Sequence, residues 1–171
     1  MNKQEFALES FKNIQELIRF IDQKSGAVLL VAGLILTVFL ELSKALVLNL
    51  NNPSYAGLFT FTFGVSTALL LIYVIYLSIF KILIPRLAKH YVGSDLSLIY
   101  FNHLASMIDK TVVFEQFNKL NGDSILKNLT DQIFEISKIL DTKIIELNKS
   151  MNFLFISIAT LLAFIFASRL I

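Results

Sequence analysis

The sequence predicts an all-α membrane protein in which three transmembrane helices are joined to a cytosolic helical bundle. The first observation behind this prediction is composition: 56% of the 171 residues are hydrophobic and only 16% are charged. A typical soluble domain is about 45–50% apolar and about 25% charged. The second is distribution, because long uncharged runs alternate with charged segments. This composition disfavours an ordinary soluble enzyme and excludes a disordered chain.

The N-terminal segment, residues 1–24, carries eight charged residues and a regular apolar pattern. Phe11, Ile14, Ile18 and Ile21 are spaced 3, 4 and 3 apart, which places them on one face of a helix. A cleaved signal peptide needs an apolar stretch directly after a short basic start. We therefore predict a cytosolic N-terminal amphipathic helix over 1–24 and no cleaved signal.

Three runs without charge follow, and their lengths are 16, 27 and 19 residues. A helix needs roughly 20 mostly apolar residues to cross the hydrocarbon core of a bilayer. The first run reaches this length if Glu41 and Lys44 lie at the far interface, where long side chains extend toward water. The predicted transmembrane helices are 25–43, 57–80 and 151–168.

Lysine and arginine counts predict the orientation. Residues 1–24 hold four, the loop 41–53 holds one, the segment 81–149 holds nine and the C-terminal tail holds one. Because cytoplasmic segments are enriched in these residues, we expect the N-terminus and 81–149 to be cytoplasmic. The chain is then expected to pass through the membrane several times.

Residues 81–149 form the predicted cytosolic helical sensor region. Its first residues are expected to continue the second transmembrane helix until Pro85, which lacks a backbone N–H, kinks or ends it. Gly93-Ser94-Asp95 indicates a turn, and a helix is favoured for 96–104 and for 109–120. The clearest break is Asn121-Gly122-Asp123-Ser124.

A single long helix is predicted from Ser124 to Ser168. The apolar residues that indicate it are spaced 4, 4, 3, 4, 4, 3 and 4 apart: Ile125, Leu129, Ile133, Ile136, Leu140, Ile144, Leu147 and Met151. Leu140-Asp141-Thr142-Lys143 in this helix repeats the apolar-Asp-x-Lys pattern of Ile21-Asp22-Gln23-Lys24. We interpret this echo as chance or a common preference of membrane interfaces.

No catalytic pattern accompanies these helices, so an enzyme is not predicted. The chain has no cysteine, which excludes disulfides and thiolate chemistry. His90 and His103 do not stand at a metal-binding spacing from carboxylates. The net charge of +2 gives no case for nucleic acid as a partner.

Small residues recur at a spacing of four in two predicted spans: Gly64 and Ala68, and Ala159, Ala163 and Ala167. Such spacing lets helices approach closely in lipid. It is explained by packing within one chain or by the interface of a homo-oligomer, which we also expect.

Three features together resemble the Pycsar transmembrane effectors, the PycTM family. Ile21-Asp22-Gln23-Lys24-Ser25-Gly26-Ala27 before an apolar helix is similar to that family's Asp-x-Lys-Ala/Ser opening. The segment 97–105, Ser-Leu-Ile-Tyr-Phe-Asn-His-Leu-Ala, looks like its Tyr-Phe block. The long helix from Asp131 into the last span is also similar, and the resemblance extends over about 10–168.

The resemblance implies a membrane effector of bacterial antiphage defence that causes abortive infection. In that family a partner cyclase makes a cyclic pyrimidine mononucleotide, cyclic CMP or cyclic UMP, which is the ligand expected here; no other cofactor and no metal is expected. The effector senses the nucleotide and impairs the integrity of the inner membrane.

Candidate ligand residues lie in or near the sensor region's first half. Arg86, Lys89, His90 and Lys110 are suited to offset a phosphate charge, and Tyr91, Tyr100 and Phe101 to stack on a pyrimidine. The same residues are also explained as topology signals and interfacial anchors. Two alternatives remain for the whole chain: an effector gated by another cyclic nucleotide signal, or a small structural or scaffolding membrane protein.

Overall fold

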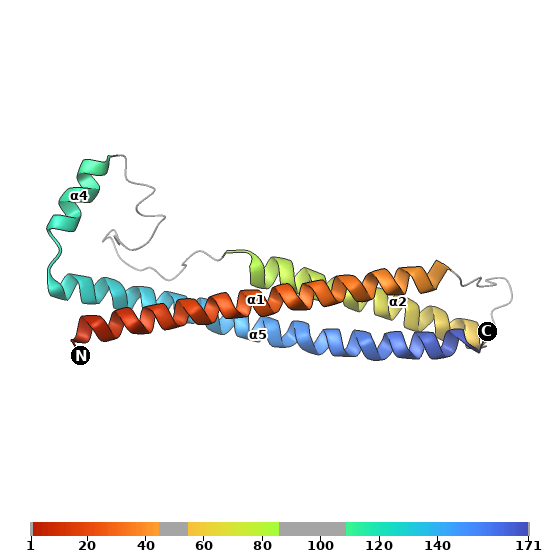
Figure 1. The fold of residues 1–171 in the computed structure, drawn as a ribbon. Coiled ribbons are helices and arrows are strands. Elements are labelled where there is room, and N and C mark those ends of the chain that lie inside the picture. The colour runs from red at the N-terminus through yellow and green to blue at the C-terminus, as the bar shows by residue number, and fades with distance from the viewer. Residues whose placement is uncertain (1, 45–54, 86–108, 171) are drawn as a thin grey trace. The chain divides into compact units, whose positions relative to one another are not determined.

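The fold is all-α in the computed structural model, which describes residues 2–44, 55–85 and 109–170. Within those ranges there are four α-helices, labelled in Figure 1: α1 (Lys3–Lys44), α2 (Tyr55–Tyr76), α4 (Lys110–Asn118) and α5 (Gly122–Ser168). A π-helical segment, η1 (Leu77–Leu83), continues α2. Three of these helices are long and apolar enough to cross a membrane: α1, α2 with η1, and α5. The predicted three spans are therefore present as helices.

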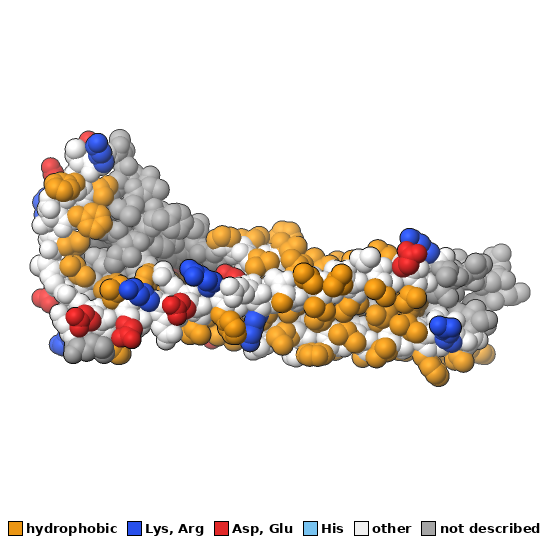
Figure 2. Space-filling view, viewed as in Figure 1, with side chains coloured by type: hydrophobic (Ala, Val, Ile, Leu, Met, Phe, Trp, Pro, Cys, Tyr) orange, Lys and Arg blue, Asp and Glu red, His pale blue; other side chains and the backbone are white. Residues whose placement is uncertain are grey.

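The chain divides into two compact units. One comprises Met1–Phe20 and Arg86–Thr142 and is called the polar unit below. The other comprises Ile21–Pro85 and Lys143–Ile171 and is called the membrane unit, because it holds the three uncharged runs. Figure 2 shows hydrophobic side chains over the helices of the membrane unit, and lysine, arginine, aspartate and glutamate side chains gathered on the polar unit.

Helices α1 and α5 each continue without a break from one unit into the other. The 47 residues of α5 correspond to a helix about 70 Å long at 1.5 Å per residue. The predicted uninterrupted helix 124–168 is confirmed. The predicted boundary between 1–24 and 25–43 falls inside a single helix, because no proline and no unfavourable turn interrupts α1.

The start of α5 explains the break predicted at Asn121-Gly122-Asp123-Ser124. The Asn121 side chain accepts a hydrogen bond from the Ser124 backbone N–H at 2.8 Å, and the Ser124 hydroxyl accepts one from the Asn121 N–H at 2.9 Å. This reciprocal pair satisfies donors that the first turn of a helix leaves without partners. In the polar unit, the Gln4 side chain donates to the Gly122 carbonyl at 2.8 Å and so fixes the start of α1 to the start of α5.

Pro85 ends the second membrane helix, as the sequence predicts. The residue before a proline is driven toward extended backbone, and Ile84 has φ −61° and ψ 127°. Its N–H bonds to the Ile79 carbonyl at 3.1 Å, a π-type spacing of five residues. The expected continuation toward Tyr91, the turn at 93–95 and the element at 96–104 lie outside the described residues.

The core of the membrane unit forms where α1, α2 and α5 pack together (Figure 1). One cluster joins Ala32 of α1, Leu71 and Val74 of α2 and Leu154 of α5. A second joins Phe39 of α1 to residues of α5 that include Phe164. Leu30, Leu69, Leu162 and Phe166, by contrast, point outward and are more than 60% exposed. An exposed apolar exterior around a packed interior is what a helix bundle in lipid requires.

Candidate functional site

Most of the predicted ligand residues cannot be placed, because Arg86, Lys89, His90, Tyr91, Tyr100 and Phe101 lie outside the described residues. His103 lies there too. Lys110 is described, and it is the exposed first residue of α4. The arrangement of the seven predicted residues is therefore untested, and the ligand site stays a hypothesis.

The environment of Lys110 is set by the cap of α4. The side chain of Asp109 accepts a hydrogen bond from the Thr111 backbone N–H at 3.0 Å. This bond, together with the Thr111 side chain, lowers the pKa of Asp109 below its usual range. A carboxylate thus already occupies the anion-binding end of this helix, so a phosphate bound by Lys110 would lie beside a negative charge.

The polar unit also contains an open groove between α1 and α5, with a volume of about 570 Å³. It is lined by Phe6 and Ala7 of α1 and Leu126 and Ile133 of α5, with polar residues that include Lys3 at its rim. Its size lies within the range of small-molecule sites. Its walls are mainly apolar, however, and Lys3 is the one cation among the lining residues, so the groove offers little to a phosphate.

No group of three or more histidine, cysteine, aspartate or glutamate side chains placed to hold a metal ion occurs in the described parts of the chain.

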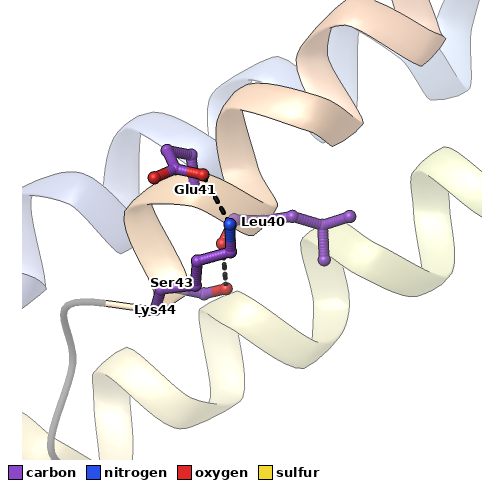
Figure 3. Close-up of polar contacts among 4 residues, drawn as sticks. All are labelled: Leu40, Glu41, Ser43 and Lys44. Carbon is purple, nitrogen blue, oxygen red and sulfur yellow. Dashed lines mark hydrogen bonds and ion pairs between the residues drawn. The ribbon is translucent and has the colours of Figure 1, made fainter.

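In the membrane unit, the far end of α1 carries charges at the position that the sequence predicts for an interface. Lys44 Nζ contacts Glu41 Oε2 at 2.7 Å, both side chains are more than 70% exposed, and the Ser43 hydroxyl donates to the Leu40 carbonyl (Figure 3).

Hydroxyl groups line the interior of the membrane unit. Ser25, Thr60, Thr67, Ser78, Ser150 and Ser157 are completely buried. Two contacts join α5 to the second membrane helix: the Thr67 hydroxyl donates to Thr160 at 3.0 Å, and the Ser78 and Ser150 hydroxyls lie 3.2 Å apart. Ser25 Oγ has no hydrogen-bond partner among the described residues. The interior of the membrane unit is therefore not purely apolar.

A partly buried ion pair joins α1 and α5 in the same unit. Lys143 Nζ contacts Asp22 Oδ1 at 2.5 Å, and the Lys143 side chain is only 4% exposed against 34% for Asp22. These residues belong to the two apolar-Asp-x-Lys segments, and the aspartate of the first segment meets the lysine of the second. The sequence alone does not predict this contact, although the repeated apolar-Asp-x-Lys pattern marks the two segments that form it.

The small-residue spacing is explained by packing within one chain or by a homo-oligomer interface, and Gly64 packs within the chain. A β-carbon at Gly64 would lie 3.1 Å from the ring of Phe164. Gly64 therefore serves close packing within the chain. Ala167 is buried as well, whereas Ala159 is exposed; the homo-oligomer stays a prediction.

Comparison with known proteins identifies the family. No curated protein and no solved structure matches the chain. The family model PycTM, the Pycsar effector protein domain, matches residues 6–169. That range includes the three membrane-length helices apart from the first three residues of α1, together with the Asp22–Lys143 pair and every predicted ligand residue. Pycsar effectors are activated by cyclic nucleotides and are generally not enzymes. The chain belongs to the PycTM family of Pycsar membrane effectors.

Proposed function

We propose that the chain is an antiphage effector of the bacterial inner membrane that is activated by cyclic CMP or cyclic UMP and then impairs membrane integrity. A partner cyclase supplies the nucleotide during infection, and the membrane damage causes abortive infection. The observation that carries the proposal is the PycTM match over 6–169 of a chain with three membrane-length helices. The family supports the class of signal, and the helices support the target.

In the proposed orientation, the N-terminus and the segment 81–149 are cytoplasmic. The support is the lysine and arginine count, four in 1–24 and nine in 81–149 against one in 41–53. The polar unit then lies on the side where a cyclase releases its product. Tyr76 and Lys81, whose ammonium lies 5.9 Å from the Tyr76 ring, suit the cytoplasmic interface of the second membrane helix.

The proposed ligand site is the segment from Arg86 to Lys110. Its cations Arg86, Lys89 and Lys110, with His90, offset the single negative charge of a cyclic phosphate. The rings of Tyr91, Tyr100 and Phe101 stack on the pyrimidine. The groove between α1 and α5 is a poorer choice because its walls are mainly apolar.

A ligand shifts a conformational equilibrium only by binding one state more tightly than the other. The continuity of α1 and α5 supports a direct route for such a shift, since each helix has residues in both units. A change in how the nucleotide-bound polar unit holds either helix is then carried into the membrane unit along an unbroken helix.

The proposal is tested by inducible expression in bacteria that lack a cyclase, with a dye that reports membrane potential. Separate cultures express a cytidylate or a uridylate cyclase together with the effector. We expect depolarisation only when effector and the matching cyclase are present. Inactive cyclases with the same expression level are the control. Unchanged potential with both active cyclases, while the effector is found in the membrane fraction, would refute the proposal.

The two alternative functions give different outcomes in the same cells. An effector gated by another cyclic nucleotide stays silent with both pyrimidine cyclases and depolarises the membrane with an oligonucleotide synthase. A scaffolding protein leaves the potential unchanged with every synthase and co-purifies with a stable protein subunit.

A further inference from the structure

The Asp22–Lys143 pair is placed where a movement of α5 against α1 must break it. Asp22 lies on α1 and Lys143 on α5, one at each side of the packed face in the membrane unit. By contrast, the Lys44–Glu41 and Lys149–Glu146 pairs each join residues three apart on one helix. Those two contacts survive any displacement between helices, whereas the Asp22–Lys143 contact does not.

Because Lys143 is buried, it depends on its partner Asp22. The Lys143 side chain is 96% removed from solvent, so its ammonium depends on the Asp22 carboxylate for compensation. Replacing a buried ion pair by apolar residues is often neutral, whereas removing one partner is strongly destabilising. Buried polar pairs are best known for fixing the register of packed helices. A role in alignment suits this pair better than a role in overall stability.

The packing beside the pair repeats every seven residues. On α5, Lys143, Ser150 and Ser157 alternate with Leu147, Leu154 and Leu161, and all six are buried. On α1, Ser25, Ala32 and Phe39 are buried at the same spacing. A seven-residue repeat is the pattern of helices that pack along a continuous seam.

Four of these nine seam residues have small or hydroxyl side chains: Ser25, Ala32, Ser150 and Ser157. Such residues fill little volume, so at their positions fewer contacts oppose a shift of one helix along the other than at the Phe39–Phe164 packing. Ser25, three residues after Asp22, already has no hydrogen-bond partner among the described residues. The charge pair is the seam contact whose separation leaves a buried ammonium without its carboxylate.

We propose that Asp22 and Lys143 form a latch between α1 and α5 that holds the membrane unit in its resting arrangement, and that separation of the pair belongs to activation. This inference rests on the proposed function and names its regulation. The latch sets the difference in binding free energy that the nucleotide must supply. The ligand has to favour the separated state by more than the ion pair favours the joined state.

The test is a charge exchange in the full-length chain, read as membrane depolarisation without any cyclase. Asp22→Lys places two cations together and Lys143→Asp two carboxylates, so each single change is expected to raise the leak by about tenfold or more. The double variant, D22K with K143D, restores an opposite pair and is expected to return the leak to within about twofold of the unchanged chain. Lys149→Asp, a charge reversal on the exposed face of the same helix, is the control and is expected to leave the membrane potential unchanged.

The outcomes separate the latch from the proposed function. Single variants that stay quiet, or a double variant that leaks as much as the singles, overturn the latch even when the unchanged chain responds to its cyclase. If the single variants leak and the double variant does not, the latch is supported even when neither cyclic CMP nor cyclic UMP activates the unchanged chain. In that case only the proposed ligand is wrong.

A second measurement decides the matter if the charge variants do not reach the membrane. The chain has no native cysteine, so Asp22→Cys with Lys143→Cys places two thiols across the seam and removes the ion pair. This variant is expected to leak without nucleotide, to become quiet when a short cleavable thiol cross-linker joins the two helices, and to leak again after cleavage. A leak that is indifferent to the cross-link would overturn the latch.

Discussion

Phe164 of α5 packs its ring against the backbone of Gly64 in α2, 3.1 Å from the point where a β-carbon would stand. Phe39 of α1 joins the same cluster, with its ring centroid 5.2 Å from that of Phe164. Three helices therefore meet at one glycine. Because the neighbouring atoms belong to an aromatic ring in a packed core, this site has little room to adjust.

The first prediction is that Gly64→Leu lowers the free energy of unfolding by about 1–3 kcal/mol, since overpacking displaces the Phe164 ring. Gly33→Leu on α1 is the matched control, because no neighbouring atom lies within 4 Å of a β-carbon there. Thermal unfolding in detergent, followed by circular dichroism, measures both. Equal midpoints for the two variants would contradict the packing at Gly64.

The second prediction concerns the hydroxyl contact between Thr67 and Thr160. Thr67→Val preserves shape but removes the bond to Thr160, and we expect a loss of about 0.6 kcal/mol, typical of such bonds in membrane proteins. Thr160→Val should cost less when added to Thr67→Val than it costs alone, because the shared bond is already gone and only the Thr160 bond to the Ser157 carbonyl remains to be lost. Thr62→Val on the same helix, where the exposed hydroxyl bonds only within α2, is the control. Fully additive losses would show that the two hydroxyls do not interact.

The third prediction is a pH dependence at the start of α4. The Thr111 hydrogen bonds lower the pKa of Asp109, so the folded helix favours the charged carboxylate. The cap's contribution is therefore complete above the ordinary aspartate pKa and is lost as the pH falls through the lowered folded pKa. Amide exchange at Thr111 and Val113 should accelerate relative to α5 over that acidic range. Asp109→Asn keeps a cap without this titration, and an unchanged pH profile in that variant would refute the assignment.

The fourth prediction tests the proposed ligand site. Arg86→Ala and Lys89→Ala should each weaken binding of the activating nucleotide by roughly tenfold or more, because a charge-assisted hydrogen bond contributes about 1.5–3 kcal/mol. Lys119→Ala, an exposed cation just after α4, should bind as the unchanged chain does. Titration calorimetry on detergent-solubilised protein gives the three affinities. Equal affinities for all three variants would remove Arg86 and Lys89 from the site.

The apolar stripe predicts the packed face of α5 only in part. Leu129 and Leu147 of the stripe are buried, as predicted. Elsewhere the packed face is offset by one residue: Ile133 and Ile136 are half-buried and Ile144 and Met151 exposed, whereas the preceding residues are buried, namely Gln132, Glu135, Lys143 and Ser150. In water the apolar face packs inward, but in lipid both faces are apolar and small or polar residues mark the helix contacts.

Contacts between distant residues are the other part that the sequence does not predict. The end of α2 follows from Pro85 and the start of α5 from Asn121 and Ser124, because these are local effects of backbone and capping chemistry. The Asp22–Lys143 pair joins residues 121 positions apart, and its partners become known only once the helices are packed. The PycTM resemblance, by contrast, was predicted from the order of three motifs and is confirmed over 6–169.

The most direct test of the central claim uses purified protein in sealed liposomes that contain a fluorescent ion reporter. Cyclic CMP and cyclic UMP are added separately, with linear CMP and UMP as controls. The account predicts that one cyclic pyrimidine nucleotide binds and releases the ion gradient, while neither linear nucleotide does. Intact gradients and no binding with both cyclic nucleotides, for a protein that remains helical in the bilayer, would contradict it.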